Sequence, residues 1–112
     1  MKIDSYRFGE IVIGGKKYTE DVIILPGRVI SWWRKRGHTV EVSDLNEAAG
    51  AEPEILIIGT GAYGAVRVLP EVNDFLSLKG IKLTVLPSPQ ACERYNRLST
   101  QHRIVAALHL TC

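Results

Sequence analysis

The amino-acid sequence predicts an α/β domain: a three-layer α/β/α core with a mostly parallel central sheet, preceded by an N-terminal antiparallel β unit. Two observations lead to this fold class. The first third of the chain is rich in β-branched residues and tight turns, whereas the remainder alternates helical and strand patterns. In addition, the run Ile55–Ile58 is apolar without alternation, which is typical of a strand that is covered on both faces.

Length and composition limit the chain to one domain. It has 112 residues, of which 46% are hydrophobic and 23% are charged, and its formal net charge is +2. This balance excludes a self-repelling disordered chain and a protein dominated by nucleic-acid electrostatics. The two cysteines exclude a disulfide framework. We therefore expect a single domain over residues 1–112, in which a β unit (1–34) packs on a βα core (44–112).

Turn residues divide the N-terminal β unit into strands. Lys2–Ile13 is predicted to be extended, and Gly14-Gly15 to form a two-residue hairpin turn, because glycine accepts the positive φ that such a turn requires. This register places Ile11 opposite Tyr18 as a cross-strand pair. Two further strands are expected, at Val22–Leu25 and Arg28–Trp33.

The remainder of the chain is predicted to alternate helices and strands. Asp44 is expected to cap a short helix over Leu45–Ala49. A second helix is expected over Leu69–Leu78, and Ser88 followed by Pro89 predicts the start of a third, with the serine as its cap. Ala91, Tyr95 and Leu98 form the buried stripe of that helix, and the expected strands are Ile55–Ile58, Lys82–Leu86 and Ile104–Leu110.

The most suggestive motif is the glycine loop, residues 59–64, which matches G-x-G-x-x-G directly after an apolar strand. A dinucleotide site needs an acidic residue about 20 positions further on, and none lies between Asp74 and Glu93. Two interpretations stay open: a structural turn that needs small residues, or backbone N–H groups that bind a small anion or a nucleotide. In the second interpretation the ligand-binding residues are Gly59, Thr60, Gly61, Tyr63, Gly64 and Arg67.

The cysteines and histidines show no catalytic or metal-binding spacing. Cys92 falls in the first turns of a predicted helix, where a thiol can be activated, but it neighbours the buried stripe and is expected to be buried. Cys112 is expected to be loosely held. The histidines lack metal-ligand spacing; we expect His109 to be buried and His38 to be exposed, while His102 shows no role. No catalytic residue, cofactor or metal site is predicted.

Aromatic and basic residues are adjacent in Trp32-Trp33-Arg34-Lys35-Arg36. Such a cluster can stack bases and contact phosphates, but three charges on a nearly neutral chain are a weak footprint for nucleic acid. Adjacent strand residues face opposite sides, so one tryptophan is predicted to be buried and the other exposed. An exposed tryptophan favours a protein interface, and the candidates for it are Trp32, Trp33 and Arg34.

Several short motifs, in order, resemble a known family. They are Trp33, Gly37-His38, Asp44-Leu45, Ile58-Gly59-Thr60-Gly61, Ala91-x3-Tyr95-Asn96-x-Leu98 and Arg103-x-Val105-Ala106-Ala107-Leu108-His109. This order is similar to the domain-of-unknown-function family shared by the adipogenesis-associated domain-containing protein, the mitochondrial complex I assembly factor three, and small bacterial and archaeal proteins. The resemblance covers nearly the whole chain and implies a single α/β domain with a non-catalytic assembly or regulatory role. The family usually has threonine at the position of Ser88, which keeps the capping hydroxyl.

The function predicted from these observations is a cytoplasmic, non-enzymatic protein-binding module, an assembly or accessory factor that associates with itself as a homo-oligomer or with another protein. The alternative is a small-anion or nucleotide-binding protein, or an enzyme of unassigned activity, that uses the glycine loop. Nucleic acid is not an expected partner, because the basic residues are few. A membrane is not expected either, because no apolar run approaches the ~20 residues that cross a bilayer.

Overall fold

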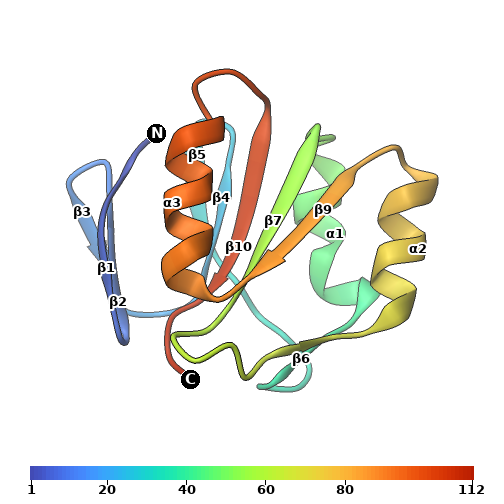
Figure 1. Cartoon of the computed structure of the whole chain (residues 1–112), viewed down its shortest axis with the longest axis horizontal. Coiled ribbons are helices and arrows are strands. Elements are labelled where there is room, and N and C mark those ends of the chain that lie inside the picture. The colour runs from blue at the N-terminus through green and yellow to red at the C-terminus, as the bar shows by residue number, and fades with distance from the viewer.

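The computed structural model describes residues 1–112, and the central element of its fold is a five-stranded sheet (Figure 1). Across this sheet the order is β5 (Arg28–Ser31), β4 (Val22–Leu25), β10 (Ile104–His109), β7 (Ile55–Thr60) and β9 (Lys82–Leu86). β7 is an interior strand that pairs in parallel with β10 on one side and β9 on the other. The α/β class is confirmed, and so is the interior position of Ile55–Ile58.

The central sheet is mixed, not mostly parallel as predicted. β4 is antiparallel to both β10 and β5, whereas the other two pairings are parallel. The tight turn at Pro26-Gly27, where Gly27 has φ +79, accounts for the antiparallel pairing of β4 with β5. A turn this short joins only antiparallel neighbours, so β4 and β5 form a hairpin that extends the central sheet. Residues 22–31, which were predicted to belong to the N-terminal β unit over 1–34, therefore belong to the central sheet.

The N-terminal residues form a separate three-stranded antiparallel sheet. Its strands are β1 (Ile3–Arg7), β2 (Glu10–Ile13) and β3 (Lys16–Tyr18). The predicted pairing of Ile11 with Tyr18 is confirmed. The single extended segment predicted over Lys2–Ile13 is wrong, because the chain reverses at Phe8-Gly9, where Gly9 takes φ +78.

Alternate residues of the central sheet pack into two separate cores. Ile57 packs with α3 (Ser88–Leu98) and with β1 and β2, whereas Leu56 and Ile58 pack on the opposite face against α1 (Asn46–Gly50) and α2 (Pro70–Leu78). Figure 1 shows α3 in front of the sheet and α1 behind it. Because helices cover both faces, β7 has apolar residues at successive positions. None of the helices combines the length and apolar character needed to span a bilayer.

The connection between β5 and β7 contains β6 (Thr39–Val40) and a short 3₁₀ helix, η1 (Val42–Leu45); β6 pairs in parallel with β8 (Arg67–Val68). Asp44 lies inside η1, so the prediction that it caps a helix over Leu45–Ala49 is wrong. Its carboxylate instead accepts the backbone N–H groups of Lys35 at 3.1 Å and Glu41 at 2.8 Å. Asp44 thereby holds the segment that follows β5 against η1.

Candidate functional site

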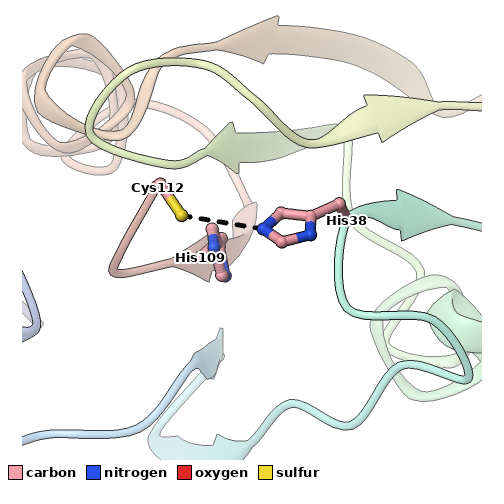
Figure 2. A group of neighbouring side chains, drawn as sticks. All are labelled: His38, His109 and Cys112. Carbon is pink, nitrogen blue, oxygen red and sulfur yellow. Dashed lines mark hydrogen bonds between the residues drawn. The ribbon is translucent and has the colours of Figure 1, made fainter.

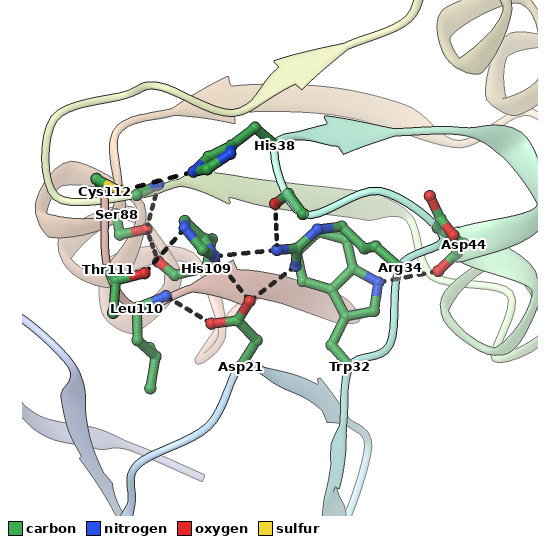
Figure 3. A network of polar contacts seen from close by, with 12 residues as sticks. Asp21, Trp32, Arg34, His38, Asp44, Ser88, His109, Leu110, Thr111 and Cys112 are labelled. Carbon is green, nitrogen blue, oxygen red and sulfur yellow. Dashed lines mark hydrogen bonds and ion pairs between the residues drawn. The ribbon is translucent and has the colours of Figure 1, made fainter.

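The candidate site lies at the edge of the central sheet where β5, β7 and β10 end. Val22 pairs with Leu108 in an antiparallel register, so the preceding residue, Asp21, lies beside His109 at the end of β10. Arg34 follows β5 and reaches the same edge (Figure 3). Ligands of open α/β sheets bind outside the carboxyl ends of the strands, which makes this edge the first place to look for function.

Asp21 is the centre of a partly buried polar network. Its Oδ2 accepts a hydrogen bond from His109 Nδ1 at 2.7 Å and pairs with Arg34 Nη1 at 2.9 Å, while its Oδ1 accepts the Leu110 backbone N–H at 2.8 Å. The Arg34 side chain is 5% exposed, donates to the Gly37 carbonyl at 2.8 Å and stacks on the Trp32 ring at 4.5 Å. The network therefore fixes the segments before β4, after β5 and after β10 relative to one another.

The contact with Asp21 sets the tautomer of His109. His109 Nδ1 lies 2.7 Å from Asp21 Oδ2 and 3.1 Å from Arg34 Nη2; because the carboxylate only accepts and its contact is the shorter, we assign the proton to His109 Nδ1. The other ring nitrogen, Nε2, then keeps its lone pair and accepts a hydrogen bond from Thr111 Oγ1 at 3.2 Å. The predicted burial of His109 is confirmed, since only 7% of the residue is exposed.

The two tryptophans face opposite sides, as predicted. Trp32 is 5% exposed, and its Nε1 donates to the Asp44 carbonyl at 2.9 Å, whereas Trp33 is 81% exposed. β5 ends at Ser31, so the predicted strand over Arg28–Trp33 is two residues too long, although the alternation continues past its end. A surface hollow of about 310 Å³ lies here, lined by Glu20, Asp21, Ser31, Trp32, Trp33 and Arg34.

The glycine loop lies at the same edge, but its backbone N–H groups are bonded to the chain itself. The Gly61 N–H donates to Ser88 Oγ at 2.9 Å, and those of Ala62 and Ala65 donate to the carbonyls of Thr111 at 2.6 Å and Cys112 at 3.1 Å. An anion-binding loop presents such groups to a ligand. Of the two interpretations left open by the sequence, these hydrogen bonds favour the structural turn.

The side chains proposed to assist the glycine loop do not form a common site. Thr60 is buried and its Oγ1 donates to the Leu86 carbonyl at 3.2 Å. Tyr63 is 79% exposed and packs against Phe8, with the ring centroids 6.0 Å apart, while Arg67 is exposed in β8. These three residues are close in sequence to Gly59, Gly61 and Gly64 and lie at the same edge of the sheet, but their side chains do not point to one shared site.

Ser88 connects three segments and does not cap α3 as predicted. Its hydroxyl donates to the His109 carbonyl at 2.5 Å and accepts the Gly61 N–H, while Pro87 occupies the N-cap position. A buried hydroxyl with both partners in place holds the glycine loop, α3 and β10 together. The sequence signal was ambiguous, because a hydroxyl residue before proline looks the same whether it caps the helix or reaches across to another strand.

Cys92 is buried, and burial, with a smaller contribution from Glu93, raises the pKa of its thiol to about 12. At neutral pH this thiol is protonated and unreactive. We expect an aromatic disulfide reagent to label one thiol of the folded protein, Cys112, and to reach Cys92 only after denaturation. The Cys92→Ala variant should show the same native labelling as the unmodified chain. Two rapidly labelled thiols in the folded protein would contradict this assignment.

The structure brings together three residues that the spacing in the sequence kept apart. His38, His109 and Cys112 each offer a ligand atom within 4.8 Å of the other two (Figure 2). His38 Nε2 and Cys112 Sγ are 3.6 Å apart, and His38 is exposed as predicted. His102 lies elsewhere, 3.3 Å from Glu54. Cys112 was expected to be loosely held, but its carbonyl accepts a hydrogen bond from the Ala65 N–H at 3.1 Å.

Comparison with known proteins identifies a family and several relatives. The model of a family described as "Protein of unknown function (DUF498/DUF598)" matches residues 3–110. The NADH dehydrogenase (ubiquinone) 1 alpha subcomplex assembly factor 3 of Danio rerio is 32% identical over 107 residues, covering 94% of this chain and 61% of the relative. The same factor of Xenopus tropicalis is 28% identical over 109 residues, covering 96% and 59%. The chain thus spans about three fifths of the length of these relatives.

Solved structures of small uncharacterised proteins share the whole fold. A conserved hypothetical protein from Pyrococcus horikoshii matches with a TM-score of 0.92 and 28% identity, covering 100% of both chains. A Bordetella parapertussis protein matches with a TM-score of 0.84 and 30% identity, covering 97% of this chain and 94% of that one.

One further relative was found by sequence. A Francisella tularensis protein named 13 kDa major membrane protein is 24% identical over 106 residues, covering 93% of this chain and 85% of that protein. The resemblance inferred from the motifs is confirmed.

Proposed function

Because the chain belongs to the family of proteins of unknown function DUF498/DUF598, we propose that it is a non-enzymatic module that acts through protein contacts, in an assembly or accessory role. The relatives named as assembly factors support the proposal, since they align with almost the whole chain. The chemistry of the described site also supports it. The titratable residues of the network bind one another, and the more buried of the two thiols is held in its unreactive form.

The observation that carries the proposal is the exposure of Trp33 beside the surface hollow. Trp33 is 81% exposed, while its two chain neighbours are anchored: Trp32 donates to the Asp44 carbonyl, and Arg34 pairs with Asp21. Tryptophan is among the residues that contribute most to binding energy at protein interfaces. Because its neighbours are anchored, little backbone freedom is lost when a partner covers it. Trp33 and the hollow together form what we call the tryptophan face.

Site-specific photo-cross-linking tests this function. A photoreactive phenylalanine analogue at position 33 is expected to give one discrete cross-linked product in cells, whose mass shows whether the partner is a second copy or another protein. Leu78 is the matched control position, because it is 90% exposed at the end of α2. The Trp33→Ala variant should keep its stability within about 0.5 kcal/mol. Its association should weaken by about 30-fold or more, as for an interface residue worth about 2 kcal/mol.

Two outcomes would contradict the proposed role of the tryptophan face. If position 33 gives no discrete product, or gives the same products as position 78, the tryptophan face is not the binding surface. If Trp33→Ala leaves the association of the identified pair unchanged, the exposed ring does not contribute to binding.

A further inference from the structure

We propose that His38, His109 and Cys112 form a binding site for a divalent metal ion of the zinc class, with the fourth coordination position open to water or a small ligand. None of the three ligand residues belongs to the tryptophan face, although Asp21 and Arg34 line its hollow and also hold His109; the metal site does not depend on the proposed function. It begins from the three ligand atoms that lie within 4.8 Å of one another at the end of β10.

The donor set selects the metal. Two imidazole nitrogens and one thiolate sulfur are ligands that Zn²⁺ and its chemical substitute Co²⁺ accept, whereas Mg²⁺ and Ca²⁺ prefer oxygen. Three protein ligands with one open position are the arrangement found where zinc binds an exchangeable water. The cluster is accessible from solvent, because His38 is exposed and Cys112 is half-buried.

The observed separations suit tetrahedral coordination. A nitrogen at about 2.05 Å and a sulfur at about 2.3 Å from one zinc ion are about 3.6 Å apart when they subtend a tetrahedral angle. His38 Nε2 and Cys112 Sγ are 3.6 Å apart without a metal. The third ligand atom lies within 4.8 Å of both, and a tetrahedral site brings two nitrogens to about 3.4 Å. The His38 side chain is exposed, so its rotation can change this separation.

The network around Asp21 prepares His109 as a ligand. Histidines that bind metals donate their other ring N–H to a carboxylate or carbonyl, which fixes the ring and raises its basicity. His109 Nδ1 donates to Asp21 at 2.7 Å, and Arg34 and the Leu110 N–H hold that carboxylate in place. His109 Nε2 keeps its lone pair, and its hydrogen bond from Thr111 Oγ1 is given up when the metal binds.

Backbone contacts also hold the other two ligands before a metal arrives. The His38 carbonyl accepts the Arg67 N–H at 2.9 Å, and the Cys112 carbonyl accepts the Ala65 N–H at 3.1 Å. Binding requires no oxidation or reduction: the Cys112 thiol loses its proton to the solvent, and the resulting sulfur lone pair bonds to the metal.

Titration of the reduced, metal-free protein with Zn²⁺ alone, followed by calorimetry, tests the site. We expect one equivalent to bind, and Co²⁺ to give the absorption bands of a sulfur–cobalt bond. Loss of a residue that only hydrogen-bonds a metal ligand weakens metal binding by roughly 10- to 100-fold. His38→Gln and Cys112→Ser each remove a ligand and should weaken binding by more than that. His102→Gln and Cys92→Ala are the matched controls, since neither residue belongs to the cluster, and they should bind as the unmodified chain does.

Asp21→Asn probes the outer partner and should weaken Zn²⁺ binding by roughly 10- to 100-fold while retaining the sulfur–cobalt bands. Far-UV circular dichroism checks that each variant is folded. Three results would overturn the proposal: no binding of Zn²⁺, stoichiometric binding that survives both His38→Gln and Cys112→Ser, or binding that needs Cys112 but not His38. The last result would show an adventitious thiol adduct only.

Discussion

Asp21→Ala is expected to lower the free energy of unfolding by about 3–5 kcal/mol, the usual effect of removing one partner from a buried ion pair. The substitution leaves the Arg34 guanidinium, whose side chain is 5% exposed, without its carboxylate. It also removes the acceptor of the Leu110 backbone N–H and of His109 Nδ1. The loss should be large because one side chain accepts from three donors in two separate segments, one after β5 and one at the end of β10.

Urea unfolding followed by tryptophan fluorescence measures this loss, since Trp32 stacks on Arg34 and reports on the network. Glu20→Ala is the matched control: it removes the neighbouring acidic side chain, which is exposed, and should change stability by no more than about 0.5 kcal/mol. A melting temperature lowered by more than about 12 °C is expected for Asp21→Ala, since each kcal/mol shifts it by about 4–8 °C at this size. Equal effects of the two substitutions would mean that the ion pair contributes nothing.

A double substitution separates the charge from the packing. Asp21→Asn with Arg34→Met removes both charges while keeping similar volumes, and replacing a buried pair with uncharged groups is often nearly neutral. We therefore expect the double variant to be more stable than the sum of its single variants predicts. Strict additivity would show that the two side chains do not interact energetically.

Sequence periodicity was sufficient for the parts of the fold that depend on burial. Ile55–Ile58 is apolar at every position because helices cover both faces of β7, so its interior place could be inferred directly. The opposite orientations of Trp32 and Trp33 followed from the alternation of an extended chain. An antiparallel β4–β5 pair agrees with the predicted N-terminal β unit, but its place in the central sheet was not predicted, because strand patterns alone do not specify which sheet a hairpin joins.

The polar contacts of the candidate site were less accessible from the sequence. Asp21 was not predicted as a site residue. Its contact with His109 depends on the pairing of Val22 with Leu108, and no residue near Asp21 in the chain indicates that pairing. His38 and Cys112 meet for a similar reason, since their contact depends on how two loops return to one edge of the sheet. Such long-range contacts leave no local spacing to detect.

Gly61→Ala is the second large effect we expect, a loss of about 2–5 kcal/mol. Gly61 has φ +104, where a side chain costs about 1–2 kcal/mol, and forcing an atom into a filled space costs about 1–3 kcal/mol more. A Cβ at this position would lie 2.5 Å from the Cys112 carbonyl oxygen and 2.9 Å from that of Thr111. These are backbone atoms held by the Ala62 and Ala65 N–H groups, so they yield only if those hydrogen bonds break.

The same variant distinguishes a structural glycine loop from a ligand-binding one. Gly50→Ala is the matched control, because its Cβ would meet no atom within 4 Å and its φ is not positive; its stability should change by less than about 1 kcal/mol. Gly61→Ala should also accelerate labelling of Cys112, because the segment that carries this thiol is displaced from the loop. If Gly61→Ala is as stable as Gly50→Ala and Cys112 labels at its normal rate, the loop does not hold the end of β10. Its glycines would then need another explanation, of which close approach to a ligand is the first to test.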